Sequence, residues 1–155
     1  MSTIANKIAS LGLTLPVPSV PVAAYVPYTI AGNLVFISGQ LPIENGQIKI
    51  TGKLGAEIDI ATGQQAAKLC ALNILAHLNT ACGGDLDKVA RCIKLGGFVA
   101  CTPDFSDQPQ VINGASELMQ QIFGAEGQHA RFAVGTNVLP RNAAVEIEAV
   151  FALKS

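Results

Sequence analysis

The sequence predicts an α+β fold in which two long helices pack on one sheet, with a short helix before them at the N-terminus. Residues 62–81 and 104–124 place apolar side chains at helical spacing, whereas five shorter stretches carry the alternation typical of strands. In chain order the main elements are β-β-α-β-α-β-β. With 155 residues, 50% of them apolar, the chain is long enough to bury one core, so we expect a single domain over residues 1–155.

The N-terminal part divides into a helix and an extended segment. Apolar residues recur at helical spacing between Ser2 and Leu11, which predicts a short amphipathic helix. Four prolines between Pro16 and Pro27 then exclude a helix and favour an extended segment that crosses the surface. Tyr25 and Tyr28 lie in this segment, where a tyrosine either packs with its hydroxyl in water or walls a pocket.

Residues 33–40 (NLVFISGQ) read as the first strand. The apolar run stops near Gly39, a residue that permits a bulge or the close approach of another group. The Glu44-Asn45-Gly46 turn follows, and Asn-Gly is the strongest short hairpin signal. We therefore expect residues 48–50 to form the second strand.

The first long helix is predicted from Thr62, where Thr62-Gly63-Gln64-Gln65 matches a capping box, to about Ala81. Gly83 and Gly84 stop it. Its polar stripe is narrow and consists of Gln65, Lys68, Asn73, His77 and Thr80. Only this stripe should meet water, so His77 is expected at the surface.

A long strand over residues 89–101 and a second helix over residues 104–124 follow. Gly96 and Gly97 in mid-strand indicate that another group packs close there. Ser106 or Asp107 is expected to cap the helix, whose first turn accommodates Pro109 and whose end is Gly124. The predicted buried face of this helix is Val111, Ile112, Ala115, Leu118, Met119 and Ile122.

The stretch from His129 to Val150 reads as two strands around a Pro-Arg-Asn turn. If residues 138–141 close a hairpin, Arg131 lies opposite Glu148 and Ala133 lies opposite Glu146. Directly opposed residues share a face of a sheet, which would place one guanidinium beside two carboxylates. The pattern fits a solvated ion pair, and it also fits a site in which Arg131 holds a ligand carboxylate and a glutamate orients water.

Composition disfavours several classes of function. The formal net charge is −1 and the basic residues are scattered, so there is no electrostatic footprint for nucleic acid. Cys70, Cys82, Cys92 and Cys101 lack C-x-x-C spacing, and we expect reduced, buried thiols rather than a metal site. We find no apolar run of transmembrane length and no signal-peptide pattern, so we expect a cytoplasmic protein.

Over roughly residues 20–153 the chain resembles the RidA (YjgF-type) family. The resemblance rests on Tyr25, AGNLVFISGQLP at 31–42, ARFAV at 130–134, LPRNAAVEIEAV at 139–150 and the helix that contains Asn113. The N-terminal extension, residues 1–20, resembles a longer branch of the family. The resemblance implies a chorismate-mutase-like fold and a homotrimer with a ligand cleft at each interface. It also implies a 2-iminobutanoate/2-iminopropanoate deaminase-type hydrolase, which converts 2-imino or enamine acids to 2-oxo acids and ammonia without a cofactor.

The same resemblance assigns residues to the site. It implies that Arg131 binds the substrate carboxylate and that Glu146 positions the attacking water, and these are the expected catalytic residues. The expected substrate-binding residues are Tyr25, Ser38, Gly39, Asn113 and Ala133.

Three positions depart from the family pattern. Ala133 replaces a cysteine, Phe132 replaces the usual serine and His129 replaces a proline. The change at Ala133 is tolerated if only its backbone is needed. His129 has two interpretations: a contact at the pocket rim, or a local acid or base.

Three other functions stay open. The Arg131 fork equally suits a non-catalytic binder of small carboxylates. Relatives have been described as ribonucleases or translation inhibitors, and the low charge argues against that role here. A structural or chaperone-like trimer with a vestigial cleft is the remaining hypothesis.

Overall fold

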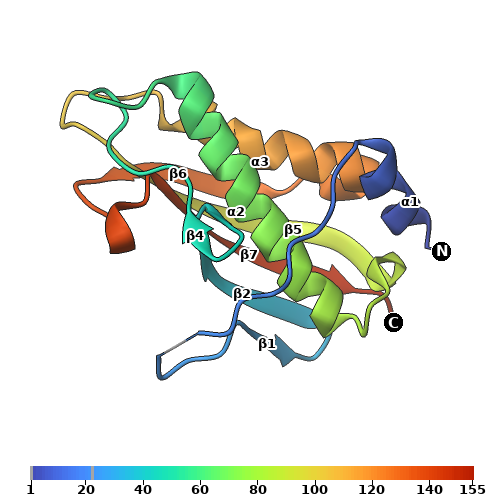
Figure 1. The fold of residues 1–155 in the computed structure, drawn as a ribbon. Helices are drawn as coiled ribbons and strands as arrows, with labels where there is room; N and C mark the ends of the chain where they lie inside the picture. The colour runs from blue at the N-terminus through green and yellow to red at the C-terminus, as the bar shows by residue number, and fades with distance from the viewer. Residues whose placement is uncertain (1, 22) are drawn as a thin grey trace.

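The computed structural model describes residues 2–21 and 23–155. A five-stranded sheet with the order β1-β2-β7-β5-β6 is covered on one side by α2 and α3, and α1 lies at one end of the helical layer (Figure 1). The helices are α1 (Thr3–Ser10), α2 (Ile60–Ala81) and α3 (Gln108–Phe123), with short 3-10 turns at Leu86–Lys88, Gly124–Gly127 and Pro140–Asn142. The strands of the main sheet are β1 (Tyr28–Ala31), β2 (Leu34–Gln40), β5 (Val89–Ala100), β6 (Ala130–Thr136) and β7 (Val145–Leu153). The predicted α+β fold, with two long helices on one sheet and a short N-terminal helix, is confirmed.

Helix α1 begins where the sequence predicts it. The Ser2 hydroxyl accepts the N–H of Ala5, and the Asp87 carboxylate accepts the N–H groups of Thr3 and Ile4 at 2.8 and 2.9 Å. These bonds satisfy orphan donors of the first turn. Ile8 is the buried residue of this helix, so its apolar face anchors the N-terminal segment on the core.

The first hairpin differs from the prediction. β2 pairs with β1, which the neighbouring prolines hid, and residues 48–50 do not enter the main sheet. The Asn-Gly turn instead closes a separate small hairpin of β3 (Ile43–Glu44) and β4 (Gln47–Ile48). The predicted bulge near Gly39 is confirmed, because the register of β2 against β7 shifts between Ile37 and Gln40.

Helix α2 starts earlier than predicted, and a larger part of its surface is buried than predicted. Its cap is Asp59, whose carboxylate accepts the N–H of Thr62 at 2.8 Å, so the expected capping box is wrong. The expectation that His77 is a surface residue is also wrong, because only 2% of it is exposed. Asn73 explains why: its amide donates to the carbonyls of Leu41 and Ile43, so the chain after β2 covers this part of the polar stripe. The other three residues of the stripe stay exposed.

Strand β5 carries the expected close contacts at its two glycines. A Cβ on Gly97 would lie 2.6 Å from Ile112 of α3, and one on Gly96 would lie 2.7 Å from the ring of Phe132. Helix α3 has Pro109 in its first turn and ends before Gly124, as predicted, but it starts at Gln108 rather than near residue 104. Asp107 occupies the N-cap position without a side-chain cap hydrogen bond, so the expected cap is wrong. Its predicted buried face is confirmed, with Ser116 as an additional buried residue.

The predicted hairpin between the last two strands is wrong. β6 pairs with β5 in parallel, and β7 lies between β2 and β5 in antiparallel pairing with both. The physical reason is the helix: β5-α3-β6 is a crossover unit, which returns the chain parallel to its first strand. Strand β5 therefore separates Arg131 from Glu148.

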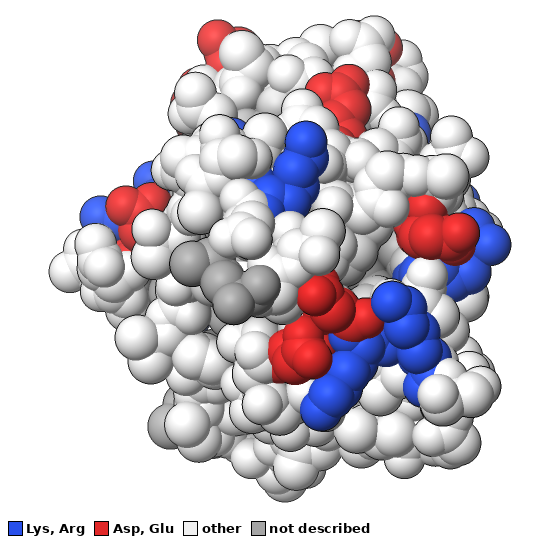
Figure 2. Space-filling model, turned by 90° about the vertical axis from the view of Figure 1, so that its right-hand side faces the viewer, with Lys and Arg blue, Asp and Glu red and all other residues white. Residues whose placement is uncertain are grey.

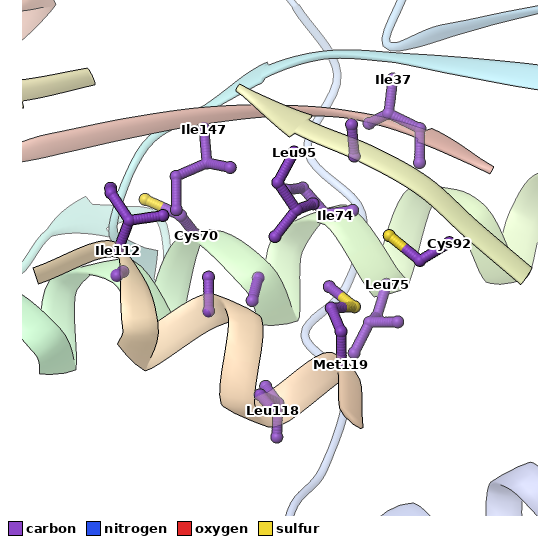
Figure 3. Packing of buried hydrophobic residues seen from close by; sticks show 14 of the residues in the cluster. Ile37, Cys70, Ile74, Leu75, Cys92, Leu95, Ile112, Leu118, Met119 and Ile147 are labelled. Atoms are coloured by element: carbon purple, nitrogen blue, oxygen red, sulfur yellow. The ribbon is translucent and has the colours of Figure 1, made fainter. Parts of the chain in front are cut away.

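The core fills the space between the sheet and the two long helices. Figure 3 shows Leu95 and Ile147 of the sheet packed over Ile74 of α2 and Ile112 of α3. The four cysteines are free thiols, of which Cys101 alone is partly exposed. In the part of the chain that the structure describes, no helix is both long and apolar enough to cross a membrane.

Candidate active site

Arg131 lies on the helix-covered side of the sheet, on its edge strand β6. Its partner across the parallel ladder is the buried residue Leu95. The next residue, Phe132, projects to the other side, where its ring meets that of Phe98 with centroids 5.2 Å apart. Strand alternation therefore directs the Arg131 side chain to α3.

The guanidinium of Arg131 is held by three groups of α3. Nη1 donates to Asn113 Oδ1 at 2.8 Å and to Ser116 Oγ at 3.1 Å, and Nη2 donates to the carbonyl of Pro109 at 3.3 Å. Within the described residues these bonds use three of the five guanidinium N–H groups, so two remain for a ligand. Arg131 is thus fixed in place without being fully paired.

Ala133 lies two residues further along β6, on the same face as Arg131. It pairs with Gly97 and packs against the core cluster. Its methyl group has no chemistry of its own, so any part of Ala133 in binding falls to its backbone.

A second group of predicted residues meets in a cavity of about 370 Å³ elsewhere in the molecule. Tyr25, Gly39 and Glu146 all line it. A Cβ on Gly39 would overlap the Glu146 carboxylate, so this position needs glycine for the carboxylate to lie where it does. The bulge of β2 and the start of β7 together build this half of the site.

The Glu146 carboxyl is in an environment that favours its protonated form. Burial raises its pKa first, and the charge of Glu148 raises it further. A carboxylate whose pKa lies above its ordinary value is a better proton acceptor for water. The location therefore suits a general base.

Ser38 fixes the segment before β1 by two hydrogen bonds. Its hydroxyl donates to the carbonyl of Val26 at 2.7 Å, and its N–H donates to the carbonyl of Pro27 at 2.9 Å. These bonds hold the segment that carries Tyr25 beside β2.

The structure thus divides the predicted residues into two groups. Arg131 and Ala133 of β6 lie beside Asn113 of α3, whereas Tyr25, Gly39 and Glu146 line the cavity. Val145 and Ile147 are buried under the helices, so Glu146 between them projects from the opposite face. The expected single-face cluster of Arg131, Glu146 and Glu148 is therefore wrong.

Sequence reasoning missed several residues near these groups. Ser116 was recoverable, because it lies three positions after Asn113 on the same helical face. His77 lines the Glu146 cavity, and burial lowers its pKa, so it is neutral near pH 7. Nothing in its spacing indicated this position.

Other features offer little competing chemistry. A larger hollow of about 560 Å³ near Cys101 and Gln108 contains none of the predicted site residues. No group of three or more His, Cys, Asp or Glu residues in the described chain is placed to hold a metal ion. On the face shown in Figure 2, acidic and basic side chains alternate and form no patch of one sign.

Comparisons with known proteins agree with the fold. A family model described as YjgF/chorismate mutase-like, a description that also names endoribonuclease, matches residues 5–153. Protein TCP17 of Trypanosoma cruzi is 42% identical over 153 residues, which are 98% of this chain and 95% of that protein.

Solved structures extend the comparison. Atu1372 from Agrobacterium tumefaciens, a protein of unknown function, superposes with a TM-score of 0.92 at 52% identity, over 97% of this chain and 92% of that one. E. coli TdcF with bound serine superposes with a TM-score of 0.63 at 25% identity, over 92% of this chain and 96% of that one.

Proposed function

Because the chain belongs to the YjgF/RidA family, we propose that it hydrolyses reactive 2-imino and enamine acids to 2-oxo acids and ammonia. The observation that carries the proposal is the state of Arg131. Its guanidinium is anchored by Asn113, Ser116 and Pro109, yet keeps two N–H groups for a planar carboxylate.

The proposed site is completed between subunits of a homotrimer. Arg131 and Glu146 project from opposite faces of one sheet, so a single subunit does not bring them together. The face away from the helices exposes Phe36, Phe98 and Val134 by 43, 38 and 43%. An apolar face of this kind is stabilised by a second sheet, which would carry the Glu146 cavity of one subunit to the Arg131 edge of the next.

The chemistry needs one anion-binding group and one base. Arg131 holds the carboxylate of the iminium acid, and Glu146 takes a proton from a water that attacks C2. The C–O bond forms as the C=N π electrons move to nitrogen, which gives a neutral amine on a tetrahedral carbon. Glu146 returns its proton to this nitrogen. The C–N bond then breaks as Glu146 takes the proton of the new hydroxyl, and ammonia leaves as the 2-oxo acid forms. Glu146 finally releases this proton to solvent. The proposed reaction requires no cofactor.

The remaining residues shape the substrate's surroundings. Tyr25 is 57% exposed beside Glu146, so it is available to cover a ligand from a neighbouring half-site. Asn113 holds Arg131 rather than the substrate. The absence of a thiol at Ala133 leaves its backbone as the group for binding.

A second candidate function is the binding of small carboxylates without turnover. It is favoured by the solved structure of E. coli TdcF, which holds bound serine. The two N–H groups of Arg131 would suffice for it. Glu146 distinguishes the two functions, because a binder does not need a base.

Nucleic-acid cleavage has less support. The net charge is −1, and the charges in Figure 2 are mixed in sign. An affinity for RNA that falls steeply with salt concentration would support this function instead.

The deciding experiment measures ammonia released from 2-imino acids that an amino-acid oxidase generates in situ. Arg131→Ala should raise KM and lower kcat/KM about 10²-fold, because a bidentate charged pair is lost. Lys88→Ala removes one positive charge from an exposed site and should behave as wild type. If Arg131→Ala retains full turnover, the role assigned to Arg131 is wrong. If wild type binds 2-oxo acids without turnover, the proposed hydrolysis is wrong and the protein is a binder.

A further inference from the structure

Four groups beside α3 form a continuous hydrogen-bonded chain. Arg131 Nη1 lies 3.1 Å from Ser116 Oγ, which lies 2.9 Å from His129 Nε2. His129 Nδ1 lies 2.7 Å from the carbonyl oxygen of Gly127. The chain joins the arginine of the candidate site to a backbone group outside it.

For a neutral His129 ring, the chemistry of the two ends fixes the direction of every bond. A carbonyl oxygen only accepts, so His129 Nδ1 carries a proton. In the neutral imidazole Nε2 is then bare and accepts the hydroxyl proton of Ser116. Since a guanidinium only donates, Ser116 Oγ accepts from Arg131. All the bonds run one way, from Arg131 to Gly127, and each polarises the next.

Ser116, inside this chain, and Gly127, at its end, both rest on rigid structure. Ser116 is 6% exposed on the buried face of α3. Gly127 is also buried, and a Cβ there would overlap the carbonyl of Met119, so the turn after α3 packs directly on the helix. The acceptor for His129 therefore has little freedom to move.

We propose that His129 and Ser116 are positioning residues that hold the Nη1 side of Arg131, so that its free N–H groups face the substrate carboxylate. The inference rests on the proposed function for its substrate. Asn113 and Ser116 each receive an Nη1 bond, and together they stop rotation of the guanidinium plane. Both nitrogens of His129 are engaged, so it does not act on substrate as an acid or base.

The tautomer of His129 tests the chain without any activity assay. The protein has only two histidines, so ¹⁵N–¹H spectra of the imidazoles are assigned with His129→Phe. At a pH where the ring is neutral, we expect the proton of His129 on Nδ1. A neutral ring with its proton on Nε2 would overturn the proposal, because Ser116 would then have no acceptor there.

Kinetics test the positioning role. Ser116→Ala and His129→Phe should each lower kcat/KM for 2-imino acids about tenfold, mostly through KM. The double variant should lose no more than either single one, and neither change should matter in Arg131→Ala. His129→Gln should recover part of the loss, because its amide oxygen can accept from Ser116. Gln120→Ala, on the exposed side of α3, controls for helix effects.

Additive losses in the double variant, or a His129 effect that persists in Arg131→Ala, would refute the relay. Melting temperatures measured on all variants identify any loss that comes from unfolding. If wild type lacks imine hydrolysis, the proposed function fails, and the same variants are compared for 2-oxobutanoate binding by calorimetry. If that ligand does not bind either, both the proposed function and the positioning role are wrong. The tautomer of His129 then tests only the hydrogen-bonded chain itself.

Discussion

Gly39→Ala should disable the proposed base while leaving the fold intact. The added Cβ would overlap one oxygen of Glu146 and lie 3.0 Å from its Cδ and 3.3 Å from its Cγ. Gly39 is not among the glycines with positive φ, so alanine is compatible with its backbone. The clash therefore falls on the end of a flexible side chain, which can move.

The size of the effect follows from this displacement. Relieving the overlap requires the carboxylate to move by roughly 1 Å, and a misplacement of that size costs about 10²-fold in rate. The free energy of unfolding should change by only about 1 kcal/mol, because the carboxylate can swing away. KM should stay near its wild-type value, since Arg131 is untouched on the other face.

The assay is imine hydrolysis at saturating substrate, with the melting temperature measured on the same preparation. Glu146→Gln provides the control background, in which Gly39→Ala should cause no further loss. A folded Gly39→Ala protein with wild-type kcat would refute the reasoning. An equal loss in the Glu146→Gln background would show that Gly39 acts by another route.

The charges around Glu146 and the exposed face of the sheet lead to three more expected outcomes. Glu148→Gln should move the acid limb of the kcat–pH profile to lower pH. Removing the charge of Glu148 lowers the raised pKa of Glu146, so the base stays ionised at lower pH. An unmoved limb would contradict this. Glu146→Gln should raise the melting temperature at pH 8, because a pKa raised in the folded state means that the ionised carboxylate destabilises the fold. The gain should shrink as pH falls through that pKa. A lower melting temperature of the variant at pH 8 would count against this prediction. Phe98→Asp should dissociate the proposed trimer in light-scattering measurements, and an unchanged mass would rule out that interface.

Local patterns predicted the helices well. The buried face of α3 was readable because its apolar residues repeat at helical spacing and its ends carry Pro109 and Gly124. The close contact at Gly97 was readable because glycine in mid-strand leaves space for a neighbour. These features depend on residues near each other in the chain.

Strand pairing was not readable in the same way. The alternation in β7 identifies a strand but not its partner. The turn at Pro140 suggested that β6 and β7 pair in a hairpin, whereas in the structure β5 lies between them. Asn73 and His77 looked solvent-exposed because the segment that covers them lies about thirty residues earlier in the chain. Contacts between distant segments decided both cases.

The sequence indicated candidate residues for the site but not their arrangement. Charge in apolar strands drew attention to Arg131, Glu146 and Glu148, and the family resemblance selected Glu146. A register assumed from one hairpin put all three on one face. The parallel β5–β6 pairing puts Arg131 on the face opposite the two glutamates instead. Ser116 and His129 were present in the sequence, but their hydrogen bonds depend on the turn after α3.

The most direct test of the central claim is complementation between two inactive proteins. Arg131→Ala and Glu146→Gln subunits are unfolded together, refolded as a mixture and assayed for imine hydrolysis. If each site takes Arg131 from one subunit and Glu146 from its neighbour, random assortment should restore about a quarter of wild-type activity. Each variant refolded alone should stay inactive. A mixture no more active than its separate components would contradict a site shared between subunits.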